Sequence, residues 1–112
     1  MTMPTMLIQP GEPCKLFDAD AVAAPVNSAT FAMPTTLAKV LIWVYKFASA
    51  PGSCDIQLQI SEDGVFWSTL DTGTATTGEN RTTAVTAANF IRARKNAQSG
   101  GGALTVEVTL SY

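Results

Sequence analysis

The feature of this sequence that most restricts its fold is a strict alternation of apolar and polar residues in short segments. In residues 104–112 every second position carries leucine, valine or tyrosine, and the positions between them carry threonine, glutamate or serine. Residues 55–61 alternate in the same way. Because successive side chains of a β-strand point to opposite faces, each segment is predicted to be a strand with one buried face.

Further segments rich in β-branched and aromatic residues extend the pattern, at 29–33, 39–47, 65–70, 82–86 and 90–95. Seven or eight short strands separated by turn signals predict an all-β fold, an antiparallel β-sandwich or jelly roll. One turn, Glu62-Asp63-Gly64, is predicted to be a tight hairpin that returns the chain directly into 65–70. The alanine-rich residues 19–24 are the one place where a helical turn is expected, ended by Pro25.

Residues 1–13 form a different kind of segment, with three prolines and a single charged residue. Proline removes backbone donors and fixes φ, so we expect an extended N-terminal arm here, followed by one β-sandwich domain at 14–112. Two interpretations of the arm stay open. It is a frayed terminus, or its apolar residues Met6, Leu7 and Ile8 hold it across a neighbouring subunit.

The predicted strand within 39–47 differs from the others because both of its faces are apolar. An aliphatic row consists of Val40, Ile42 and Val44, and an aromatic row consists of Leu41, Trp43, Tyr45 and Phe47. A two-layer sandwich buries one face of each sheet, so one of the rows needs a second cover. The aromatic row would present on the order of 400–600 Å², which reaches or exceeds the largest apolar patch of an ordinary soluble monomer.

Two covers for the aromatic row stay open. Either the chain's own arm or residues 19–26 fold across it, or a second copy or another protein does so. We expect another polypeptide, because only 14% of the residues are charged, compared with about 25% in ordinary soluble domains. A surface with so few charges favours association.

The composition gives little support for catalysis. The chain has no histidine, the commonest general base and metal ligand, and it contains no nucleophile elbow or phosphate-binding loop. Asp18 and Asp20 offer too few oxygen ligands for calcium. Cys14 and Cys54 are expected to be reduced thiols, and a disulfide between them stays open. We therefore expect no enzyme, no cofactor and no metal site.

The one concentration of basic residues, Arg92, Arg94 and Lys95, lies on the predicted strand 90–95. It is either a solvated outer face or an electrostatic guide toward an acidic patch on a partner. With a net charge of −2 and no dense basic block, the chain is not expected to bind nucleic acid. No secretory signal and no apolar run near the roughly 20 residues of a membrane helix is visible, so membrane contact is not expected either.

Two segments resemble known proteins. From Ser61 to Leu70 the chain follows the spacing S-x-D-G-x-x-W-x-x-L, similar to a hairpin of discoidin-like and carbohydrate-binding β-sandwiches. The segment Phe90-Ile91-Arg92-Ala93-Arg94 is similar to their y-I-R-v-r strand. Similar hairpins recur in small structural proteins of tailed bacteriophages, including capsid decoration proteins.

The phage resemblance implies a non-enzymatic virion structural protein of the capsid decoration or cement type, made in the host cytoplasm, which binds the assembled shell and stabilises it. Its partners would be the major capsid protein or other virion subunits, and it would be a homo-oligomer, with a trimer as the first guess. A phage tail, fibre or head–tail adaptor subunit is the first alternative, and a carbohydrate-binding module is the second. The contact residues expected on this basis are Leu41, Trp43, Tyr45, Phe47, Met6, Leu7, Ile8, Arg92, Arg94 and Lys95.

Overall fold

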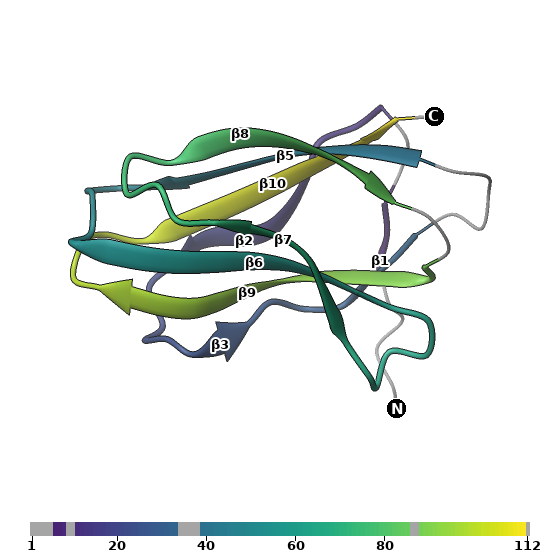
Figure 1. Cartoon of the computed structure of the whole chain (residues 1–112), viewed down its shortest axis with the longest axis horizontal. Helices are drawn as coiled ribbons and strands as arrows, with labels where there is room; N and C mark the ends of the chain where they lie inside the picture. Colours follow the sequence, from purple (N-terminus) through teal and green to yellow (C-terminus); the bar gives the residue numbers. More distant parts are fainter. Residues whose placement is uncertain (1–5, 9–10, 34–38, 86–87, 112) are drawn as a thin grey trace.

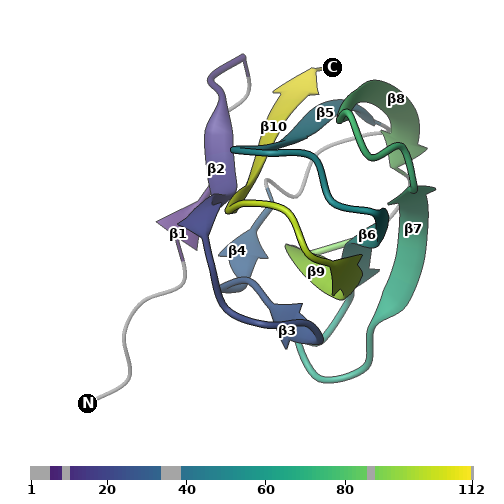
Figure 2. The ribbon, with the colours of Figure 1, turned by 90° about the vertical axis from the view of Figure 1, so that its left-hand side faces the viewer.

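Strands make up nearly all of the regular structure, and they form two hydrogen-bonded sheets that pack face to face (Figures 1 and 2). The computed structural model describes residues 6–8, 11–33, 39–85 and 88–111. Within these ranges no helix occurs. The predicted all-β antiparallel sandwich is therefore confirmed.

The larger sheet, called sheet A below, contains β1 (Met6–Leu7), β3 (Val26–Asn27), β4 (Phe31–Ala32), β6 (Ser53–Ser61), β7 (Ser68–Gly73) and β9 (Phe90–Ser99). The smaller sheet, sheet B, contains β2 (Cys14–Asp20), β5 (Lys39–Phe47), β8 (Glu79–Val85) and β10 (Leu104–Ser111). Sheet A has the order β1-β4-β9-β6-β7, with β3 also paired to β9, and sheet B has the order β2-β10-β5-β8. Only the short pair of β1 and β4 is parallel among the described strands.

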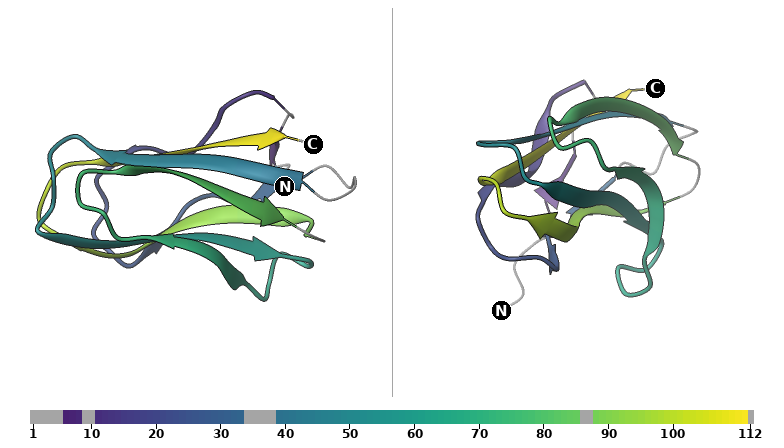
Figure 3. Two further views of the ribbon diagram at one scale, coloured as in Figure 1. Left: turned by 45° about the horizontal axis from the view of Figure 1, so that its top comes forward. Right: turned by 60° about the vertical axis from the view of Figure 1, so that its left-hand side comes forward.

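The long strands of both sheets run lengthwise through the molecule, so the two layers face each other over most of their length (Figure 3). The alternation that predicted β10 is confirmed, because Leu104, Val106, Val108 and Leu110 are all fully buried. Ile56 and Leu58 of β6 and Ile91 of β9 meet them from the other layer as members of the same core cluster. Each sheet therefore contributes one apolar face to a shared core.

The helical turn expected at 19–24 was a wrong prediction. β2 continues to Asp20, which pairs with Leu104 of β10. The carbonyl oxygens of Asp20 and Val22 both accept hydrogen bonds from the Lys95 ammonium group. Backbone acceptors that a helix would satisfy internally are thus used by a distant side chain, and tertiary contacts override the local helix propensity of alanine.

The connection between β6 and β7 is longer than the predicted tight hairpin. β6 ends at Ser61 and β7 begins at Ser68, so residues 62–67 form a loop. The expected return strand at 65–70 therefore starts three residues later than predicted.

Part of the expected N-terminal arm belongs to the sandwich. β1 lies beside β4, the Ile8 amide donates to the Ala32 carbonyl at 2.9 Å, and the Ile8 side chain is buried in the core. Farther on, the Gly11 amide donates to the Leu110 carbonyl at 2.8 Å. Ile8 therefore serves the chain's own core rather than a neighbouring subunit. The rest of the arm, residues 1–5 and 9–10, lies outside the described residues, as do the side chains of Met6 and Leu7.

Candidate docking surfaces

The aromatic row of β5 lies inside the sandwich. Leu41, Trp43 and Tyr45 are 0% exposed, and Phe47 is half-buried against the core cluster. The expectation that another polypeptide covers this row is wrong, because sheet A of the same chain covers it. The aliphatic row on the opposite face is the one that stays outside, with Val40 at 38% and Ile42 at 41% exposure.

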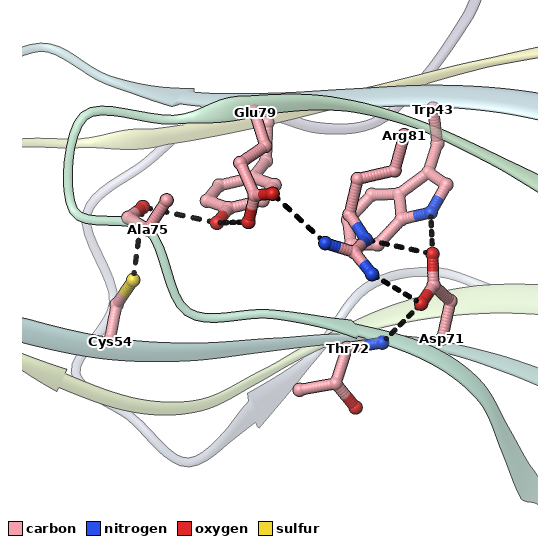
Figure 4. Close-up of polar contacts among 8 residues, drawn as sticks. Trp43, Cys54, Asp71, Thr72, Ala75, Glu79 and Arg81 are labelled. Atoms are coloured by element: carbon pink, nitrogen blue, oxygen red, sulfur yellow. Dashed lines mark hydrogen bonds and ion pairs between the residues drawn. The ribbon is translucent and has the colours of Figure 1, made fainter.

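Trp43 also takes part in a polar network that joins the two sheets where β7 lies next to β8 (Figure 4). Its indole Nε1–H donates to Asp71 Oδ2 at 2.8 Å. Arg81 Nε donates to the same oxygen at 2.9 Å, and Arg81 Nη2 donates to Asp71 Oδ1 at 3.1 Å. Burial raises the pKa of Asp71, but the bonds from Arg81 and Trp43 outweigh it, and the net pKa lies below its usual range. A charged Asp71 therefore ties β7 of sheet A to β5 and β8 of sheet B.

The other half of this network surrounds the Tyr45 hydroxyl, which lies 2.8 Å from Glu79 Oε1 and 3.0 Å from the Ala75 carbonyl oxygen. Arg81 Nη1 donates to Glu79 Oε2 at 2.9 Å, so Arg81 connects the two halves. Burial, and after it the Glu79 carboxylate, raises the pKa of Tyr45 well above its usual range. The phenol stays protonated and acts as a donor within the fold.

Both cysteines are free thiols. Burial raises the pKa of Cys14, and Glu107 raises it further. Burial also raises the pKa of Cys54, whose Sγ lies 3.6 Å from the Ala75 carbonyl oxygen. Because the thiolate is the reactive form, both residues are poor nucleophiles.

The three basic residues of β9 have different surroundings. Lys95 is buried at 2% exposure, and its ammonium group donates to Asp20 Oδ2 at 2.9 Å. The expectation that Lys95 guides a partner is therefore wrong, since its charge is neutralised inside the fold. Arg92 and Arg94 lie half-buried on the outer face of sheet A. Of the three basic residues, only these two place their charge on that face.

Arg92 and Arg94 are held by polar and aromatic neighbours. The Arg92 guanidinium lies 4.2 Å from the centroid of the Trp67 ring, and its Nε donates to Gln59 Oε1 at 2.8 Å. Arg94 donates to Asn96 Oδ1 and Asn27 Oδ1, each at 3.0 Å. Burial, with Arg94 nearby, lowers the pKa of Arg92. The outer face of sheet A thus carries positive charge in fixed positions.

The loop at 62–67 is fixed by the Asp63 carboxylate. Asp63 Oδ1 accepts hydrogen bonds from the Val65 amide at 2.8 Å, the Phe66 amide at 3.0 Å and the Ser61 hydroxyl at 3.0 Å. Gly64 has a φ of +79°, a conformation that favours glycine, and its amide donates to Ser61 Oγ. The Phe66 and Val65 amides are the main cause that lowers the pKa of Asp63. The loop therefore has a defined shape that its own side chains maintain.

This loop presents the most exposed large apolar side chains of the described residues. Phe66 is 81% exposed and Val65 is 71% exposed, whereas the next residue, Trp67, turns back beneath Arg92. Figures 1 and 2 show the loop between β6 and β7 projecting away from sheet B. A hollow of about 310 Å³ lies beside it, lined by Ile60, Ser61, Glu62, Asp63, Phe66, Ser68 and Ala88.

Sequence reasoning assigned Val65 and Phe66 to a strand and so missed them as surface residues. The available signal was their position: two large apolar residues directly follow an Asp-Gly turn, before Trp67 makes the first packed contact. An Asp side chain that bonds to amides two and three residues later opens the turn into a wider loop.

No family model matches this chain, and no curated protein matches it. In the described part of the chain, no helix is long and apolar enough to cross a membrane. Among those same residues, no three histidine, cysteine, aspartate or glutamate side chains gather in a way that would hold a metal ion.

Proposed function

We propose that this protein is a non-enzymatic structural component of a virion, of the capsid decoration or cement type, and that the loop tip Val65-Phe66 docks it on the assembled shell. The exposure of this tip on a loop of fixed shape is the observation that carries the proposal. The tip lies within residues 61–70, the segment that resembles a hairpin of small phage structural proteins. The proposed docking residues are therefore those of the exposed loop, in place of the aromatic row, which is buried.

The physical chemistry of the tip suits an anchor. Burying a phenylalanine side chain completely is worth roughly 1.5–3 kcal/mol, and a few aromatic anchors of this kind carry most of the energy of many interfaces. Because hydrogen bonds to Asp63 already hold the loop, little conformational entropy remains to be lost on binding. Arg92 and Arg94 would add steering toward an acidic surface rather than affinity.

The mechanism is mass action. A protein that binds the assembled shell but not its free subunits lowers the free energy of the assembled state, and the stabilisation grows with its concentration. No bond is made or broken in this process. Many copies on one shell would add their effects.

Replacing Phe66 by serine is expected to weaken binding to phage heads that lack the protein by about 30-fold, corresponding to about 2 kcal/mol. The fold should be unaffected because the side chain is 81% exposed. Co-sedimentation of a dilution series with the heads measures the affinity. Val22→Ser is the matched control, since Val22 is 58% exposed on a different loop, and its binding should equal that of the wild type. Unchanged binding of Phe66→Ser, or no binding of the wild type to heads, would contradict the proposal.

The same experiment distinguishes shell decoration from the first alternative, a tail, fibre or adaptor subunit. Purified tails replace the heads in a second series. Binding to tails and not to heads would overturn decoration in favour of a tail, fibre or adaptor subunit, with the Val65-Phe66 tip again as the anchor.

A carbohydrate-binding module is a second candidate, favoured by the exposed Phe66 ring beside the hollow. An exposed ring can stack on a sugar, and the Ser68 hydroxyl and the Glu62 carboxylate on the hollow's lining are groups that hydrogen-bond sugar hydroxyls. A glycan array probed with the wild type and with Phe66→Ser tests this. Millimolar or tighter binding that is lost in Phe66→Ser would favour this candidate over shell docking.

A further inference from the structure

We propose that the outer face of sheet B is a self-association surface on which two copies of this chain pack face to face. This surface lies on the side of the sandwich away from the 62–67 loop (Figures 1 and 2). The proposal goes beyond shell docking and does not depend on it.

The centre of this face is the aliphatic row of β5. Val40 and Ile42 are 38% and 41% exposed, and Val44 is half-buried. In a central strand of a sheet, an outward row of three β-branched aliphatic residues is apolar surface that the sandwich itself cannot cover. The aromatic row on the inner face of β5 already fills the core. A rotation of β5 about its own axis therefore could not bury the aromatic row and the aliphatic row together.

The register of sheet B defines what surrounds the row. Ile42 lies between Thr109 of β10 and Thr82 of β8, and Val44 lies between Glu107 and Asn80. Directly paired residues of neighbouring strands point to the same face, so all four flank the aliphatic row. Val40 is flanked in the same way by Ser111 and Ala84. The face is therefore apolar at its centre and mainly uncharged and polar beside the centre, with the exposed Lys15 of β2 paired to Glu107 at one edge, which is the pattern of an interface.

The size of the face fits a second copy. Four strands about 4.8 Å apart and about 26 Å long present a sheet face on the order of 500 Å² before side-chain relief is counted. A standard stable interface buries about 800 Å² of accessible surface per partner, so a face of this size corresponds to a weak dimer, in the micromolar to millimolar range. Two such flat faces can pack about 10 Å apart, as the sheets of a sandwich do.

The charges of the face also fit a second copy. A two-fold axis that lies between the two facing sheets, perpendicular to β5 at the level of Ile42, places each strand of sheet B over the same strand of the other copy. In that arrangement Glu107 lies over the second copy's Ser111, and Thr109 lies over the second copy's Thr109. Lys46, which is exposed near the end of β5, stays at the rim in water. No carboxylate is forced onto a carboxylate.

The test uses the isolated protein without any particle, so its failure is separate from failure of shell docking. Sedimentation equilibrium of the wild type should give twice the 11.8 kDa mass of the chain at micromolar to millimolar concentration. Ile42→Lys places a charge at the centre of the face, and the dimer dissociation constant should rise at least about 30-fold. Thr69→Lys is the matched control, on an exposed position of β7 in sheet A, and should leave the dimer unchanged.

Circular dichroism verifies that each variant is folded. If Ile42→Lys is unfolded, Ile42→Thr keeps the β-branched shape and should weaken the dimer in the same direction. A wild type that stays at 11.8 kDa at every concentration overturns the proposal, as does a mass of three chains. Dissociation of the dimer by Thr69→Lys but not by Ile42→Lys would overturn it as well.

Discussion

Replacing Trp43 by serine is expected to unfold the protein rather than to release a folded monomer. Trp43 is 0% exposed between the two sheets. Truncating a buried tryptophan to a small residue costs about 3–5 kcal/mol. The change also removes the hydrogen bond from the indole to the charged Asp71, which keeps its bonds from Arg81, and the loss of such a bond adds about 1.5–3 kcal/mol. A small domain has a total stability of only about 5–15 kcal/mol, so most of it would be lost.

Urea denaturation followed by circular dichroism measures this effect. Ile42→Ser is the matched control, because Ile42 directly precedes Trp43 in β5 and points to the outer face with 41% exposure. Its free energy of unfolding should fall by about 1 kcal/mol. If Trp43→Ser is folded with near wild-type stability, the aromatic row does not fill the core as described.

Replacing Gly73 by alanine is expected to destabilise the fold by about 3 kcal/mol. Gly73 ends β7 directly against the Tyr45 ring, and a Cβ atom there would overlap Cε1 of that ring and lie 2.7 Å from Cζ. The hydroxyl of Tyr45 is fixed by Glu79 and Ala75, so the ring cannot move aside without losing those contacts. The cost arises from overlap, since Gly73 does not have a positive φ.

The control for this change is Gly52→Ala, where the added Cβ would meet only the Ser99 carbonyl oxygen at an ordinary 3.6 Å. Its free energy of unfolding, measured by urea denaturation, should match that of the wild type within about 0.5 kcal/mol. The double variant Gly73→Ala, Tyr45→Leu should lose less than the sum of the single changes, because leucine removes the overlapping ring. Full additivity would contradict the steric explanation.

Most of the long strands could be predicted from the sequence, but β2 at Cys14–Asp20 was not expected as a strand, and the choice between the two faces of β5 could not be made. The run of β-branched and aromatic residues gave the correct bounds of β5. Alternation gave the buried face of β10, because period-two burial depends on backbone geometry alone. In β5 both rows are apolar, so periodicity does not distinguish the inner row from the outer one. The decisive contacts were the Asp71 partner of Trp43 and the close approach of Gly73 to Tyr45, and both partners lie on β7.

Prediction from the sequence has the same limit for the candidate site residues. Lys95 is in a run of basic residues, but its partner Asp20 is far away in the sequence, and no local pattern predicts that the pair is buried. Val65 and Phe66 were assigned to a strand because β propensity does not include the hydrogen bonds by which Asp63 widens the loop. In each case a long-range or side-chain contact decided where the residue lies.

This chain covers its own aromatic row. That statement is tested most directly by the rate at which the Trp43 indole N–H exchanges with solvent deuterium, measured by NMR on the isolated protein over a dilution series. With its N–H bonded to Asp71 inside the sandwich, Trp43 should exchange slowly and at the same rate at every concentration, even where the dimer has dissociated. The half-buried Trp67 of the same molecule is the reference and should exchange faster. A Trp43 rate that rises on dilution toward that of Trp67 would show that another polypeptide provides the cover, and would contradict the account.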